Sequence, residues 1–190
     1  MNAMLRTLGL VAPLTMLMLV SVSVSAATDN LKPLGNLSEG ATTWHFFNGA
    51  EFPGAKGSLD VISKDGGPIG VINYDFSEGG NYVFVTSTVD MPAGYGELRI
   101  KVRANAQQMI GLRLIDEQNQ VHQLSFSGAQ TGEWQTMIFD LLNFKSKQHW
   151  GGPNDGRLYF PVKKMQLMVL NSKSSPKVGA VEYKEVQLMR

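Results

Sequence analysis

From residue 42 onward the chain repeats one local pattern, in which short runs of β-branched, aromatic and aliphatic residues are bounded by turn formers. Val, Ile, Thr, Tyr and Phe suit the pleated surface of a strand, whereas Gly, Pro, Asn and Asp interrupt it. No stretch keeps a helical apolar period over three turns, so helix content is expected to be low. The runs predict strands at 71–76, 82–89, 98–104, 110–115, 121–126, 136–141, 165–170 and 181–188.

The spacing of these runs indicates the fold class. Turn signals recur about every ten residues, which is typical of an all-β protein built as a β-sandwich or jelly roll. The segment Asp116-Glu117-Gln118-Asn119 separates two runs and predicts a hairpin. No repeat, linker or change of composition divides the chain, so residues 41–190 are expected to form a single β-sandwich domain.

The N-terminus has the pattern of a cleavable export signal. Arg6 is the only charged side chain before an apolar run over residues 8–20, and small residues follow as far as Ala27. Residues 1–26 are therefore expected to be a signal peptide, and 27–40 a flexible leader. A membrane anchor is the alternative, but the run is short for a bilayer span. The mature chain is accordingly expected to be periplasmic or secreted.

The composition restricts both stabilisation and partners. The chain has no cysteine, which excludes a lipid-modified cysteine anchor and a disulfide framework. Lys and Arg total 17 against 16 Asp and Glu, and neither sign forms a block. No nucleic-acid partner is expected, because phosphate backbones require a clustered positive surface. Stability must come from the hydrophobic core, for which about 160 mature residues are sufficient.

The run at 98–104 alternates most clearly: one side is apolar, and the other carries Arg99, Lys101 and Arg103. The next run places Arg113 between leucines in the same way. If the two strands pair, the four cations form one patch that could bind sugar hydroxyls or, better, carboxylates of acidic polysaccharides. The alternative is a solvated sheet face whose cations pair with acids such as Glu97 and Asp116.

Trp150 lies inside a turn-rich segment, residues 149–156. Such a loop either folds back and buries the indole at the edge of the core or presents it to a ligand, and a flat aromatic face suits a sugar ring. Tyr82 is a second candidate stacking platform, although it shares a strand face with another aromatic residue and is equally compatible with the core. Trp44 and Trp134 are expected in the core or at its rim.

Three segments, taken in order, are similar to one group of proteins: Trp44–Gly57 with its glycine-rich bend, Gly132–Leu141, and the closing Val181–Leu188. In these segments the chain resembles the galactose-binding-domain-like jelly rolls, which include carbohydrate-binding modules attached to bacterial glycoside hydrolases. The resemblance spans nearly all of the mature chain. It implies a ligand on a sheet face or among the loops at one edge. The candidate contacts, chosen from the cation pattern and the aromatic residues described above, are Arg99, Lys101, Arg103, Arg113, Trp150 and Tyr82.

The resemblance also implies a structural calcium between the opening bend and the last strand. Glu51 and the carbonyl groups of residues 54–57 are the candidate ligands, since calcium requires several oxygens. Where the closing strand of the family carries an acid, this chain has Lys184, with Glu185 next to it. A lysine ammonium there could replace the ion, so calcium is a candidate cofactor and no other is expected.

No catalytic pattern is complete. There is no cysteine nucleophile or G-x-S-x-G turn, and the three histidines are not spaced as zinc ligands. Gln120-Val121-His122 matches a motif of jelly-roll alginate lyases, but the tyrosine-rich segment that accompanies it there is missing. A glycosidase needs two facing carboxyl groups, and Glu51 with Asp155 is the best pair that the chain offers.

The sequence therefore predicts a secreted, non-catalytic protein that resembles a carbohydrate-binding module and recognises a polysaccharide by aromatic stacking and Arg/Lys hydrogen bonds. A cell-envelope protein-interaction or structural module is the alternative, because one fold hosts unrelated functions. A jelly-roll polysaccharide lyase is less favoured. Expected partners are a polysaccharide or oligosaccharide, with an envelope protein under the alternative.

Overall fold

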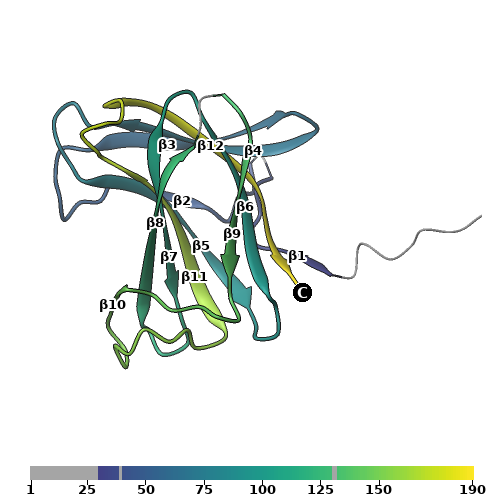
Figure 1. Cartoon of the computed structure of the whole chain (residues 1–190). Coiled ribbons are helices and arrows are strands. Elements are labelled where there is room, and N and C mark those ends of the chain that lie inside the picture. Colours follow the sequence, from purple (N-terminus) through teal and green to yellow (C-terminus); the bar gives the residue numbers. More distant parts are fainter. Residues whose placement is uncertain (1–29, 39, 130–131) are drawn as a thin grey trace, which may run out of the picture.

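The structure, a computed structural model, describes residues 30–38, 40–129 and 132–190, and the predicted signal peptide lies outside them. The described residues form two antiparallel six-stranded sheets that make a sandwich (Figure 1). They include no helix long and apolar enough to cross a membrane. The all-β sandwich predicted from the strand pattern is confirmed.

The strands, in chain order, are β1 Leu31–Pro33, β2 His45–Phe47, β3 Lys56–Lys64, β4 Gly67–Asp75, β5 Tyr82–Met91, β6 Glu97–Ala104, β7 Gln108–Ile115, β8 Val121–Ala129, β9 Gln135–Asp140, β10 Gln148–Trp150, β11 Val162–Leu170 and β12 Val178–Met189. Sheet A has the order β3-β4-β12-β6-β9, and β1 also pairs with β12. Sheet B has the order β10-β8-β7-β11-β5-β2. Figure 1 shows β1 beside the C-terminal end of β12.

Each predicted run overlaps a strand, because the strands with one buried face carry strong apolar alternation. In β6, Leu98, Ile100 and Val102 are buried while the residues between them are half-exposed. The predicted hairpin between β7 and β8 is also confirmed. Asn119 there has a φ of 59°, a left-handed conformation that Asn tolerates, and its N–H donates to the Asp116 carbonyl at 3.1 Å.

Four strands, β1, β2, β3 and β10, were not predicted from that alternation, and β2 has only three residues, His45–Phe47. β3 is polar on most of its length and forms an edge of sheet A, where burial of a full face is not required. β10 lies inside the segment expected to be a loop around Trp150. β1 lies inside the expected flexible leader, so that part of the leader belongs to sheet A; Leu34 follows it, is buried, and donates its N–H to the Val186 carbonyl at 2.8 Å.

The core lies between the two sheets and takes side chains from both. Trp44, which precedes β2, is only 2% exposed and packs edge-on against Tyr183 of β12, with ring centroids 5.2 Å apart. Its predicted place in the core is thus confirmed. The outer faces of the two sheets are then the surfaces on which a binding site can be built.

β6 and β7 do not pair, so the condition for a single four-cation patch is not met. β6 pairs with β12 and β9 in sheet A, whereas β7 pairs with β8 and β11 in sheet B. The chain crosses from one sheet to the other between Ala104 and Gln108. Arg113 is therefore separated from the three cations of β6, and the single four-cation patch does not form.

Candidate functional site

The outer face of sheet B carries a row of polar side chains that crosses all six strands. Strand register places its members directly opposite one another, in the order Gln148, Gln123, Arg113, Gln166, Thr86 and His45. We call these residues the polar row. At about 4.8 Å between neighbouring strands, the row is roughly 24 Å long. Gln148 and His45 at the two ends are exposed, and the four members between them are partly buried; all carry amide, hydroxyl, imidazole or guanidinium groups.

Arg113 stands near the middle of the polar row and is held from several sides. Its Nε donates to Gln123 Oε1 at 2.6 Å, and Gln123 Nε2 donates in turn to Gln148 Oε1 at 3.0 Å. Its guanidinium carbon lies 4.8 Å from the Tyr82 ring centroid and 5.2 Å from that of Trp150. Burial lowers the pKa of Arg113, and the nearby Glu51 opposes that shift. The guanidinium is thus a positioned cationic donor.

Aromatic rings border the polar row. Trp150 is 43% exposed on the edge strand β10, so of the two alternatives for its loop the indole is presented rather than buried at the edge of the core. Phe47 lies on β2, at the opposite edge of the sheet, and is 49% exposed. It stacks on Phe84 with the ring centroids 5.2 Å apart. Phe52 is 44% exposed in the loop before β3. This face therefore offers flat apolar surfaces next to hydrogen-bonding groups.

Tyr82 occupies the same face but in a different role. It is buried on that face, where Phe52 packs edge-on against it at 6.0 Å. Its hydroxyl lies 3.4 Å from Arg113 Nη1, which donates to it. The structure thus places the Tyr82 ring as a support for Arg113, while the exposed ring next to that cation is Trp150.

The cations of β6 lie on the outer face of sheet A and are paired with acids. Arg99 contacts Glu97 at 2.7 Å and Lys101 contacts Glu185 at 2.6 Å. Arg103 pairs with Glu182 and with Asp65. The outer face of sheet A is therefore a solvated face whose cations are paired with acids, which was the alternative to a binding patch. Glu97 is confirmed as one of these acidic partners. Asp116 is not such a partner, because it is buried and faces His122 at 3.1 Å.

Trp134 belongs to that same face of sheet A. Arg103 and Lys184 lie over its ring at 4.4 and 4.5 Å from the centroid. Its Nε1 donates to Asp65 Oδ2 at 3.4 Å. Trp134 is half-buried, as expected for the rim, and its ring is occupied by cations rather than free.

The resemblance implies a calcium between the opening bend and the last strand, and the structure places Glu51 and Lys184 apart. Glu51 lies near Arg113, and Lys184 lies on the outer face of sheet A. The carboxylate of Glu78 beside the bend is paired with Lys56 at 2.8 Å. Within the described ranges, no three His, Cys, Asp or Glu side chains form a group that could hold a metal. Calcium at Glu51 stays a prediction.

The residues of the lyase-like motif have a structural role. Gln120 and His122 are fully buried, and Asp116 Oδ2 accepts hydrogen bonds from the His122 ring and from the Tyr159 N–H, both at 3.1 Å. Gln120 Nε2 donates to the Arg157 carbonyl at 2.8 Å. This network ties the β7–β8 hairpin to the segment before β11. Because Asp116, Gln120 and His122 are fully buried, a substrate has no access to them.

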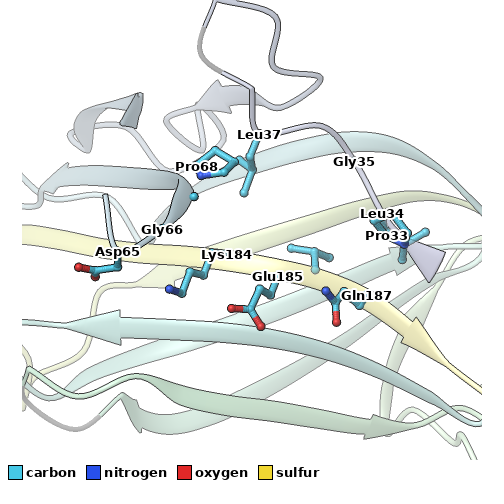
Figure 2. Close-up of a pocket in the computed structure, with 12 residues that line it drawn as sticks. Pro33, Leu34, Gly35, Leu37, Asp65, Gly66, Pro68, Lys184, Glu185 and Gln187 are labelled. Carbon is cyan, nitrogen blue, oxygen red and sulfur yellow. The ribbon is translucent and has the colours of Figure 1, made fainter. Parts of the chain in front are cut away.

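A hollow of about 300 Å³ lies on the sheet A side, between the segment after β1, the β3–β4 hairpin and the irregular part of β12 (Figure 2). Its charged lining residues are Asp65, Lys184 and Glu185. Asp65 is paired with Arg103 and Glu185 with Lys101, so two of these charges already have partners. The hollow offers fewer free polar groups than the polar row.

Comparison with known proteins supports the fold. No family model matches the chain, and no curated protein matches it. A family 11 carbohydrate-binding module of Clostridium thermocellum, solved with a β-1,3-1,4-mixed-linked tetrasaccharide, is 14% identical, with a TM-score of 0.65 over 84% of this chain and 95% of that one. A family 11 module of the cellulosomal cellulase Lic26A-Cel5E of Clostridium thermocellum is 15% identical, with a TM-score of 0.62 over 84% of this chain and 94% of that one.

An agarase, AgWH50C, is 13% identical with a TM-score of 0.55, and the match covers 84% of this chain but 24% of the agarase. At such identities the similarity shows the fold alone. The chain therefore has the β-sandwich fold of carbohydrate-binding modules, as the resemblance in its sequence implied.

Proposed function

We propose that this chain is an exported, non-catalytic carbohydrate-binding protein that holds a polysaccharide on the outer face of sheet B. The polymer lies along the polar row and stacks a sugar ring on Trp150. Arg113 and the glutamines donate to sugar hydroxyls, while the exposed aromatic rings pack on the C–H surfaces of the sugars. The export signal at residues 1–26 would bring the protein to extracellular or periplasmic polysaccharides.

The polar row is the observation that carries this proposal. A row of about 24 Å accommodates several consecutive sugar units, and it is open at both edges of the sheet. The same face presents Trp150 and Phe47 at its two ends. The sandwich fold shared with carbohydrate-binding modules supports the proposal, although it does not specify the ligand.

A second candidate function is protein interaction at the cell envelope. Ile138 and Leu142 are 54% and 75% exposed and line one hollow near β9 on sheet A. Exposed apolar groups of this kind suit a protein partner better than a sugar. The two functions use opposite sheets, so they can be tested separately.

The test is a glycan array of neutral and uronate-containing polysaccharides, probed with the chain from residue 27. We expect retention on at least one polysaccharide, and no release of reducing ends or unsaturated products when that polysaccharide is incubated with the protein. A folded protein that binds no polysaccharide would overturn the proposal and leave protein interaction as the better account. Product release would show an enzyme.

A further inference from the structure

A second hollow extends the polar row at the β8–β10 edge of sheet B. It has a volume of about 370 Å³ and is lined by Gln123, Leu124, Ser125, Lys145, Lys147 and Gln148. Gln123 and Gln148 belong to both the row and the hollow, and they are joined by the 3.0 Å hydrogen bond between their amides. A polymer lying along the row would therefore enter this hollow at its end.

The cations around this end form no ion pair with any acid in the part of the chain that the structure describes. Lys145 and Lys147 are exposed, and neither forms an ion pair with another described residue. The same holds for Arg113 in the row and for Lys164 in the neighbouring row of sheet B. On sheet A, by contrast, every cation of β6 is paired. Arg113, Lys145, Lys147 and Lys164 thus leave positive charge available on the face that carries the exposed tryptophan.

Unpaired lysines beside amide groups suit one kind of ligand. An ammonium group is a compact cation that binds a carboxylate or a sulfate as a point charge, whereas the amides supply hydrogen bonds to hydroxyl groups. A neutral sugar would leave the lysine charges unused. A sugar with an anionic substituent would engage both kinds of group in the hollow.

We propose that the polysaccharide carries anionic groups, either carboxylate or sulfate, and that Lys145 and Lys147 bind one of them at the β8–β10 end of the polar row. Arg113 then faces a further anionic unit along the same chain. This inference rests on the proposed function and adds to it the chemical class of the ligand.

The test uses pairs of polysaccharides that share a backbone and differ only in charge. One pair is de-esterified and fully methyl-esterified homogalacturonan, and the other is a sulfated galactan and its desulfated form. Affinity electrophoresis at low and moderate salt gives the dissociation constant for each. We expect the anionic member of at least one pair to bind roughly tenfold tighter than its neutral counterpart, with the difference reduced by salt. The pair that responds identifies the carboxylate or the sulfate.

Variants separate a built site from diffuse attraction. Lys145→Gln with Lys147→Gln should weaken binding of the anionic member by about tenfold and leave the neutral member unchanged. Lys64→Gln with Lys173→Gln changes the net charge equally at residues of the β3–β4 hairpin and the β11–β12 connection, and serves as the matched control. This control variant should change the affinity for neither the anionic nor the neutral member.

Two results would overturn the inference while the proposed function stands: equal affinity for neutral and anionic members in both pairs, or equal losses in the two double variants. If the protein binds no member of either pair and no polysaccharide of the array, the proposed function itself is overturned, and this inference with it.

Discussion

Two tyrosines of the core, Tyr74 and Tyr183, differ in what their hydroxyl groups contact. The Tyr74 hydroxyl donates to Gln108 Oε1 at 2.9 Å. The Tyr183 hydroxyl is buried with no hydrogen-bond partner among the described residues. Burial raises the pKa of both phenols, so both stay neutral at physiological pH. A satisfied group stabilises the fold, whereas an unsatisfied one costs desolvation.

We therefore predict that Tyr183→Phe leaves the free energy of unfolding unchanged or raises it slightly. Tyr74→Phe should lower it by about 1–2 kcal/mol, because Gln108 loses its donor inside the protein. Urea unfolding followed by fluorescence measures both. Equal destabilisation by the two substitutions would contradict the hydrogen-bond assignment.

Asp155 gives the account a pH dependence at the residue scale. Hydrogen bonds from the Tyr159 hydroxyl at 2.7 Å and from the Arg157 N–H lower the pKa of Asp155 to about 2. A carboxyl whose pKa is lower in the folded than in the unfolded state stabilises the fold above its unfolded pKa of about 3.9. That contribution is lost as the pH falls from about 4 to 2.

The corresponding substitution is Asp155→Asn. The variant should be less stable than the parent at neutral pH, and the difference should shrink as the pH falls from about 4 towards 2. Thermal melts across this range provide the measurement. A difference that is constant over the whole range would show that Asp155 acts by packing alone.

At the scale of strands, β4 and β12 approach closely at two glycines that face tyrosines. Register pairs Gly70 with Tyr183 and Gly179 with Tyr74. A Cβ on Gly70 would lie 2.3 Å from the Tyr183 ring, and one on Gly179 would lie 2.5 Å from the Tyr74 hydroxyl. Each tyrosine thus covers the glycine opposite it, which pins the register of the central strand pair.

Gly70→Ala should therefore destabilise the protein by about 1–3 kcal/mol, because the added methyl group displaces a buried ring. Gly67→Ala is the matched control in the same strand, since a Cβ there would meet nothing within 4 Å. Chemical unfolding of both variants tests the prediction. Similar stability of the two would show that β4 and β12 can shift to accommodate the methyl group.

The sequence predicted the strands that bury one face, and it missed those that do not. The alternation in β6 is plain, whereas β3 has a mostly polar sequence that is held in sheet A by its pairing with β4. β10 is short, and its pairing with β8 lies outside any local pattern. β3 is held by its hairpin with β4, and β10 by its pairing with β8, and neither pairing appears in the sequence as apolar alternation.

At the scale of the whole molecule, the site was predicted in part. Trp150 and Arg113 were both expected to contact a ligand, and in the structure the Arg113 guanidinium carbon lies 5.2 Å from the Trp150 ring centroid. The polar row was not predicted, because its glutamines come from strands far apart in sequence. Only the order of strands in sheet B aligns them. The same order separates Arg113 from the cations of β6.

A structural metal would also act on the whole molecule. The Lys56–Glu78 pair already neutralises a carboxylate at the opening bend, and the side chains around Glu51 do not gather into a metal site. The melting temperature in calcium and in a chelator tests the calcium predicted at Glu51, and equal values would contradict it. A rise in calcium would show that backbone carbonyl groups complete a site at Glu51, since a ligand that binds only the folded state raises stability.

The most direct test of the central claim compares two tryptophans on opposite outer faces. For the polysaccharide that the protein binds most tightly, calorimetry gives dissociation constants for the parent, Trp150→Ala and Trp134→Ala. We predict a loss of about tenfold or more for Trp150→Ala and less than about twofold for Trp134→Ala, because only Trp150 stacks on the ligand. The opposite ranking would place the binding face on sheet A and contradict the account.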